Sequence, residues 1–199
     1  MMKTVSRTLF INTLKNKGDL LMQKLYYEYC KSYKLNEENS EGFFDTVSEI
    51  YFSNEVQGLK IYEQHLDIDR LQHITAVAFL TYKICKRLSL DYKAASRAAV
   101  MHDLFYYDWR DGETGKWHCL HGYKHPKYAC LNARELYPDM SDKEEDIIKC
   151  HMWPLTLKPS KYKEGLVVTF CDKYCATREL MFSLNKKYKK RFLEDIKEI

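Results

Sequence analysis

From residue 73 onward, the 199-residue chain carries histidines and aspartates whose side chains can bind a metal ion. His151 follows Ile147 by one helical turn. Asp172 likewise follows Val168, so both polar residues lie on or beside an apolar stripe. A hydrogen-bonded core position is the commoner explanation for any one such residue, but a shared metal centre explains the whole set. The candidate ligands are His73, His102, Asp103, His125, His151 and Asp172.

A mixture of imidazole and carboxylate ligands favours Fe, Mn, Zn, Co or Ni over Ca²⁺ or Mg²⁺, which prefer oxygen ligands. Six such ligands can serve two ions and still leave positions open for water and substrate, as catalytic sites do. The sequence therefore predicts a centre of two divalent metal ions. The expected division is His73, His102, Asp103 and Asp172 for one ion, and His125 and His151 for the other, with Asp103 bridging.

Other polar residues near these ligands could contact a substrate. His121 could protonate a leaving oxygen or join the ligands of a metal, and a surface position is a third alternative. Arg70 precedes His73 by three residues, so the two share one face of a helix. For each cationic candidate, a solvated surface charge is the commoner alternative. The candidate substrate contacts are Arg70, Arg110, Lys124 and Lys173.

Helices are expected to position these residues, because only 7 Gly and 4 Pro interrupt the chain and apolar residues recur at three- and four-residue spacing. Asp91 can cap a helix that runs into His102, and Ser141 with Glu144 forms a capping-box pattern ahead of His151. Pro126 can occupy the first turn of another helix. Further helices are expected at 17–33, around 43–51, and at 69–88, 166–182 and 186–199.

The segment 35–42 is polar and reads as a loop, and no convincing pair of strands is present. We therefore predict an all-α fold, a single-domain helical bundle. Within it, residues 1–62 form an N-terminal helical extension that packs on the core, and residues 63–199 form the metal-binding helical core.

The net charge of +4 lacks the dense basic stripe of nucleic-acid binders, which argues against a nucleic-acid partner. No apolar run approaches the roughly 20 residues of a membrane span, and no signal peptide is evident. The seven cysteines contain no Cys-x-x-Cys pair, as expected in a reducing compartment. These features predict a cytoplasmic protein with no membrane partner, and they leave a homo-oligomer open.

The ordered series His…His-Asp…His…His…Asp resembles the HD-domain superfamily of metal-dependent phosphohydrolases, over roughly residues 69–180. The resemblance is closest to small stand-alone bacterial HD-domain proteins, which carry a His-Pro segment and a His-Met-Trp-Pro-Leu segment. The matching pieces here include His102-Asp103, His125-Pro126 and 151–155.

The resemblance implies a helical bundle that hydrolyses a phosphate ester of a nucleotide or other small phosphorylated metabolite by a metal-activated hydroxide, which Asp103 would orient. His125 and His151 match the additional histidines of two-metal members. The Gly-Lys that follows the His-Asp pair in many relatives is replaced by Leu104-Phe105, and the Gly-Tyr-Pro signature of cyclic-di-nucleotide phosphodiesterases is missing. Two alternatives stay open: a di-iron oxygenase on the same fold, and a non-catalytic regulatory module that binds metal and nucleotide.

Overall fold

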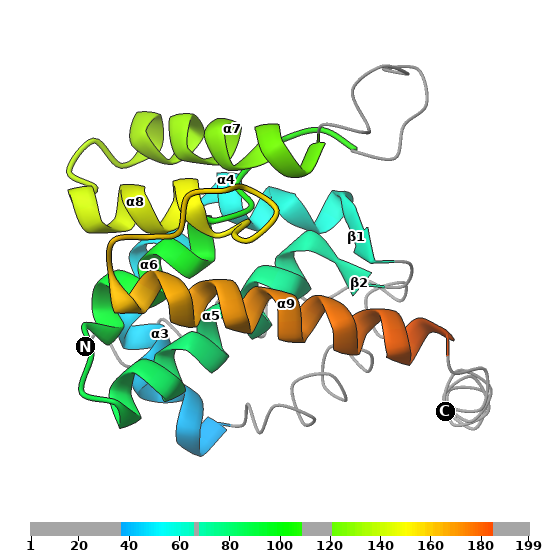
Figure 1. Cartoon of the computed structure of the whole chain (residues 1–199). Coiled ribbons are helices and arrows are strands. Elements are labelled where there is room, and N and C mark those ends of the chain that lie inside the picture. The colour runs from blue at the N-terminus through cyan, green and yellow to red at the C-terminus, as the bar shows by residue number, and fades with distance from the viewer. Residues whose placement is uncertain (1–36, 66–67, 109–120, 185–199) are drawn as a thin grey trace, which may run out of the picture.

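Helices form nearly all the regular structure in the computed structural model, which describes residues 37–65, 68–108 and 121–184 (Figure 1). A short antiparallel pair, β1 (Glu63–His65) and β2 (Ile68–Asp69), is the exception in this part of the chain. The predicted all-α class is confirmed. The helices are α3 (Glu37–Tyr51), α4 (Asn54–Gln57), the 3-10 helix η1 (Gly58–Ile61), α5 (Arg70–Arg87), α6 (Tyr92–Met101), α7 (His121–Leu136), α8 (Asp142–Cys150) and α9 (Lys163–Leu184).

Helix α5 runs through the middle of the molecule and packs against both α6 and α9 (Figure 1). Asp69 caps its N-terminus by accepting a hydrogen bond from the Gln72 backbone N–H, and the Gln72 side chain accepts from the Asp69 N–H in return. The apolar side chains Ile74, Val77 and Phe79 are fully buried. The predicted helix 69–88 is thus confirmed to within one residue at each end.

Helices α6 and α8 begin at the predicted caps. The Asp91 carboxylate accepts from the Ala94 N–H, and Ser141 and Glu144 form a reciprocal capping box. The two helices end at Met101 and Cys150, so that a histidine follows each of them directly. This placement matters for the site described below.

The predicted loop at 35–42 is wrong for residues 37–42, because α3 begins at Glu37. The sequence was misleading here, since Gly42 signals a turn. A Cβ atom on Gly42 would lie 2.7 Å from the Tyr82 hydroxyl, so the glycine permits close helix packing instead. Phe43 and Val47 of α3 join the same buried cluster as the side chains of α5 and α6, so the described part of the N-terminal extension shares the single core.

Two further local predictions differ from the structure. Helix α7 begins at His121, which places Pro126 in the second turn rather than the first. The β1–β2 pair was not predicted, because strands of three and two residues are too short to show alternation.

The helices predicted at 17–33 and 186–199 lie outside the described residues. Among the helices that are described, none combines the length and apolar character that crossing a membrane would require.

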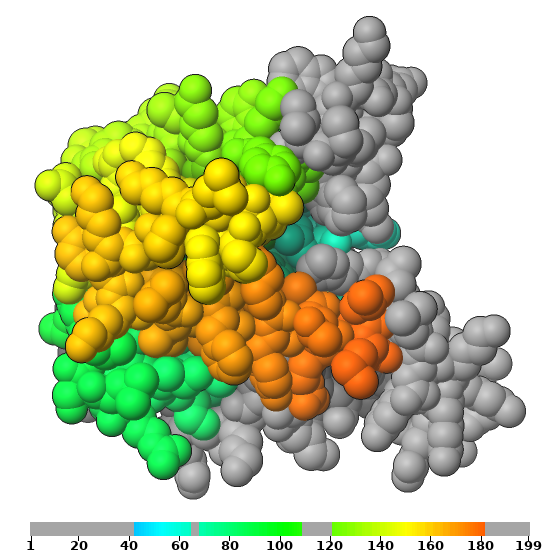
Figure 2. Space-filling view, viewed as in Figure 1, coloured from blue at the N-terminus to red at the C-terminus, as the bar shows by residue number. Residues whose placement is uncertain are grey.

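On the face drawn in Figure 2, the segment between α8 and α9 lies at the surface between α7 and α9.

Candidate metal centre

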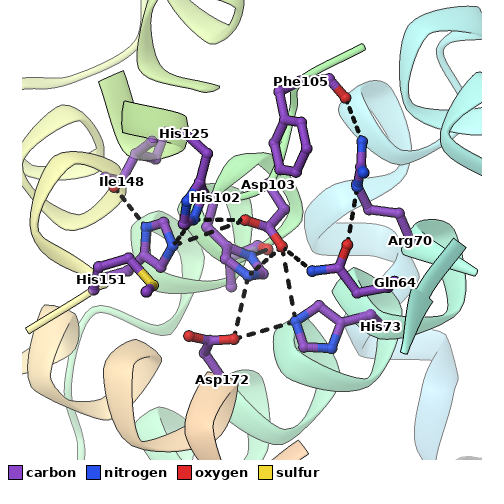
Figure 3. Close-up of polar contacts among 12 residues, drawn as sticks. Gln64, Arg70, His73, His102, Asp103, Phe105, His125, Ile148, His151 and Asp172 are labelled. Atoms are coloured by element: carbon purple, nitrogen blue, oxygen red, sulfur yellow. Dashed lines mark hydrogen bonds and ion pairs between the residues drawn. The ribbon is translucent and has the colours of Figure 1, made fainter. Parts of the chain in front are cut away.

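The six candidate ligands converge on one buried point (Figure 3). They come from five helices or helix ends: α5, the end of α6, α7, the end of α8, and α9. Each has a relative exposure of 7% or less. Groups of three among them bring their ligand atoms within 4.8 Å of one another, so this cluster could hold a metal ion. The converging residues are His73, His102, Asp103, His125, His151 and Asp172.

The Asp103 carboxylate lies between two pairs of histidines (Figure 3). Its Oδ1 atom is 3.3 Å from Nε2 of His125 and 3.8 Å from Nε2 of His151. Its Oδ2 atom is 3.7 Å from Nε2 of His102 and 4.0 Å from Nε2 of His73. The two oxygens therefore face different sides of the cluster, as a carboxylate must to bridge two ions.

Asp172 completes the side of the cluster that contains His73 and His102. Its Oδ1 atom is 3.2 Å from Nε2 of His73 and 3.8 Å from Nε2 of His102. Its Oδ2 atom accepts a hydrogen bond from Lys173 Nζ at 2.6 Å. Oδ1 is the oxygen of Asp172 that faces the histidines.

In all four histidines of the cluster, Nδ1 contacts an oxygen atom and Nε2 points toward the cluster. In His102 and His151, Nδ1 lies 2.7 and 2.8 Å from the carbonyl oxygen three residues earlier, at the end of the preceding helix. In His125 it lies 3.0 Å from the His121 carbonyl, and in His73 it lies 3.0 Å from the Glu179 carboxylate. Because these oxygens can only accept, each Nδ1 carries the proton and each Nε2 atom faces the cluster.

This orientation brings together buried ligand atoms that could hold a metal ion. Nε2 of His125 lies 2.9 Å from Nε2 of His151, so in the metal-free protein one of these rings must donate a proton to the other. Within the described residues, buried His102 Nε2 and Asp103 Oδ1 have no hydrogen-bond partner. Two ligands at right angles on an ion with bonds of about 2.1 Å lie about 3 Å apart. The spacing of these donors is therefore compatible with a bound metal ion.

The charges of the cluster are consistent with this fit. Burial would raise the pKa of Asp103, but the neighbouring histidines, His102 first among them, outweigh burial and hold this pKa well below its usual value. Burial, together with the charges of His102 and His125, lowers the pKa of His151 to about 3. Asp103 is thus ionised and His151 neutral at physiological pH, which are the states that a metal ligand needs.

His73 differs from His151. Burial lowers the pKa of its imidazole, but the carboxylates of Glu179 and Asp172 outweigh burial and hold the pKa well above its usual value. In the metal-free protein His73 therefore carries a proton that a metal ion would have to displace.

Gln64 and Arg70 support the Asp103 carboxylate from β1 and the start of α5. The Gln64 side chain donates to Asp103 Oδ2 at 2.7 Å and accepts from Arg70 Nε at 3.0 Å. Arg70 is 0% exposed and donates to the carbonyls of Phe105 and Tyr107, while its guanidinium lies 3.6 Å from the centre of the Phe105 ring. These contacts hold the segment after Asp103 and give Arg70 a structural role. The described contacts lend no support to the phosphate contact predicted for Arg70.

The remaining candidates lie around the cluster. His121 is partly exposed, stacks on His125 with ring centres 4.6 Å apart, and lies 3.2 Å through Nδ1 from the Tyr107 hydroxyl. Lys173 lies against Asp172 with 41% of its side chain exposed. Lys124 is partly exposed in the first turn of α7. Arg110 lies outside the described residues.

Sequence reasoning missed Glu179 and Gln64. Glu179 is 1% exposed and follows Asp172 by seven residues on α9, which places both on one helix face, so the spacing carried a usable signal. Gln64 lies on a three-residue strand, where no periodicity marks it.

Comparisons of the chain with models of protein families, with curated proteins and with solved structures found no match.

Proposed function

We propose that the chain is a metal-dependent phosphohydrolase of the HD-domain type, which hydrolyses a phosphate ester of a nucleotide or other small phosphorylated metabolite at a centre of two divalent ions. The order of its ligands in the sequence and their convergence in space support this proposal. The single observation that carries the metal centre is the convergence of four imidazoles and two carboxylates on one buried cluster, in which His102 Nε2 and Asp103 Oδ1 have no hydrogen-bond partner among the described residues.

Each side chain has a role that its position suggests. Asp103 presents one oxygen to each pair of histidines and would hold the two ions in register. Bound ions would lower the pKa of a coordinated water and neutralise charge on the phosphoryl oxygens. Lys173, beside Asp172 and partly exposed, is a described cation that could contact a substrate phosphate.

His121 is suited to proton transfer. If the Tyr107 hydroxyl donates to Nδ1 of His121, the proton of a neutral His121 ring resides on Nε2. From Nε2 the proton could pass to the leaving oxygen. General-acid catalysis of this kind typically raises the reaction rate by about 10²–10⁴-fold.

The test is phosphate release from a panel of nucleotides and sugar phosphates by protein loaded with Mn²⁺, Co²⁺ or Fe²⁺. We expect one substrate class to be hydrolysed, and Asp103→Asn to reduce its turnover by at least 10²-fold. Asp142→Asn is the matched control, because Asp142 is exposed on α8 and outside the cluster, and this variant should retain full activity.

Two results would contradict the proposal. Release of phosphate at equal rates by wild type and Asp103→Asn would show that the cluster is not the active site. Consumption of dioxygen by the Fe²⁺-loaded protein, with no phosphate released from any substrate, would favour the di-iron oxygenase.

A further inference from the structure

We infer that Glu179 is a positioning residue for the metal centre, and that it makes the half of the centre containing His73 the first to bind an ion. The first half-site is defined as His73, His102, Asp172 and Oδ2 of Asp103. The second half-site consists of the other two histidines and Oδ1 of Asp103. The inference rests on the metal centre of the proposed function but not on the reaction.

The geometry of Glu179 is that of a carboxylate behind a metal-binding histidine. Both of its carboxylate oxygens lie 3.0 Å from Nδ1 of His73, across 106 residues of sequence. The two residues are each 1% exposed, so solvent does not weaken the contact. Nε2 of His73, on the opposite side of the ring, is the atom that faces Asp172 and Asp103.

This contact sets His73 apart from the other three histidines. Their Nδ1 atoms face backbone carbonyls, which orient the rings without adding a formal charge. A carboxylate in the same position orients the ring and also makes Nε2 a stronger donor toward a cation. His73 is therefore the best donor of the four, and it belongs to the first half-site.

Charge favours the same half-site. It contains Asp172, whose Oδ1 atom lies 3.2 Å from Nε2 of His73 and 3.8 Å from Nε2 of His102, in addition to the shared Asp103. Lys173 contacts Oδ2 of Asp172 and leaves Oδ1 facing the histidines. Once His73 and His102 have released their extra protons, the first half-site with Glu179 behind it presents more negative charge to a divalent ion, so at neutral to alkaline pH it should fill at lower metal concentration.

The experiment is a Co²⁺ titration of chelator-treated, dialysed protein, followed by calorimetry and by the visible absorption of bound Co²⁺. Wild type should show two binding events. Glu179→Ala should weaken the first event by about 10- to 100-fold. Glu179→Gln, whose amide oxygen still accepts from Nδ1, should lose less, and His125→Ala should remove the second event only.

Glu164→Gln is the matched control, because Glu164 is also buried on α9 but contacts the Asp91 N–H, remote from the cluster. It should bind both ions as wild type does. Circular dichroism establishes that each variant is folded. If Glu179→Ala is unfolded, the affinity of Glu179→Gln for the first Co²⁺ decides whether Glu179 acts on the first half-site.

The inference is overturned if the folded Glu179 variants bind the first Co²⁺ as tightly as wild type, or if His125→Ala removes the first event. Either result could accompany normal phosphate release, which would leave the proposed hydrolase intact. Conversely, two events that respond to Glu179 in a protein without hydrolytic activity would support the inference and count against the hydrolase.

Discussion

At the scale of single residues, the cluster is defined by what lies behind each histidine rather than in front of it. A carbonyl or carboxylate fixes the proton of every ring on Nδ1 and turns Nε2 inward. A histidine that only fills space in a core needs a hydrogen-bond partner, but its ring need not point toward any particular place. Four rings with the same orientation around Asp103 are the arrangement that a metal site needs, and the cluster could hold an ion.

The pH dependence of metal binding follows from the charge states of these residues. His73 has its pKa raised well above the usual value, and the pKa of His102 is also raised, since Asp103 and Asp172 outweigh the effect of burial. Each ring therefore holds its second proton more tightly than a free imidazole does, and a metal ion would have to compete with that proton. We expect the affinity for Co²⁺ to fall as the pH is lowered from 8 to 6.

Calorimetry in buffers of different ionisation enthalpy measures the released protons directly. A pH-independent affinity without proton release over this range would mean that the metal binds elsewhere.

The six ligands could be predicted as a set because they fall on successive helices, and His151 and Asp172 lie on or beside an apolar stripe, where a buried polar side chain needs a partner. The apolar helical pattern could not reveal which side chains contact the histidine rings and Asp103. Glu179 and Gln64 lie 106 and 39 residues from the atoms they contact, and such distances are fixed by tertiary packing alone.

At the scale of secondary-structure elements, helix ends place the ligands. Helices α6 and α8 terminate just before His102 and His151, whose rings then satisfy a carbonyl of the last turn. The N-terminal caps at Asp91 and Ser141 were readable from the sequence, and they fix where these helices start. The start of α7 was not readable, because a proline is expected in the first turn of a helix, whereas Pro126 lies further inside α7.

The junction of α8 and α9 provides a test by glycine substitution. A Cβ on Gly165 would lie 2.1 Å from Oγ and 2.3 Å from Cβ of Ser160, whose hydroxyl donates to Asp146 of α8. Gly165→Ala should therefore destabilise the protein by about 1–3 kcal/mol. A Cβ on Gly58 meets nothing within 4 Å at a helical φ of −63°, so Gly58→Ala should be neutral or stabilising.

Urea unfolding of the two variants measures the difference. Equal stability of Gly165→Ala and Gly58→Ala would contradict the close approach of α9 to the preceding loop.

Arg70 tests how the segment after α6 is held. Its three donors go to three separate acceptors, which a lysine ammonium cannot reach with the same geometry. Arg70→Lys should lower the free energy of unfolding by about 2–3 kcal/mol. Arg87→Lys, at the exposed end of the same helix, should have little effect. A similar loss in both variants would show that the buried contacts contribute nothing specific.

At the scale of the whole molecule, one hydrophobic core surrounds a charged centre to which five helices contribute. The all-α class and the central helix could be predicted from spacing and caps, whereas the packing of α3 into the same core could not, because Gly42 and the polar residues before it resemble a loop. A cluster that joins so many elements should link metal binding to global stability.

Removal of metal should therefore destabilise the entire domain. At a free metal concentration about 1,000 times Kd, binding adds about 4 kcal/mol, which corresponds to a rise of roughly 10 °C in Tm for a domain of this size. Thermal melts with excess Co²⁺ and with chelator measure the shift. In Asp103→Asn the shift should be largely lost, and an unchanged shift in this variant would place the stabilising metal outside the cluster.

The central claim, that the buried cluster binds divalent metal ions, is tested most directly by anomalous diffraction from crystals of the Co²⁺-loaded protein. The account predicts two anomalous peaks on either side of the Asp103 carboxylate, one beside His73 and one beside His125. A fully loaded crystal with no peak among these residues would contradict it.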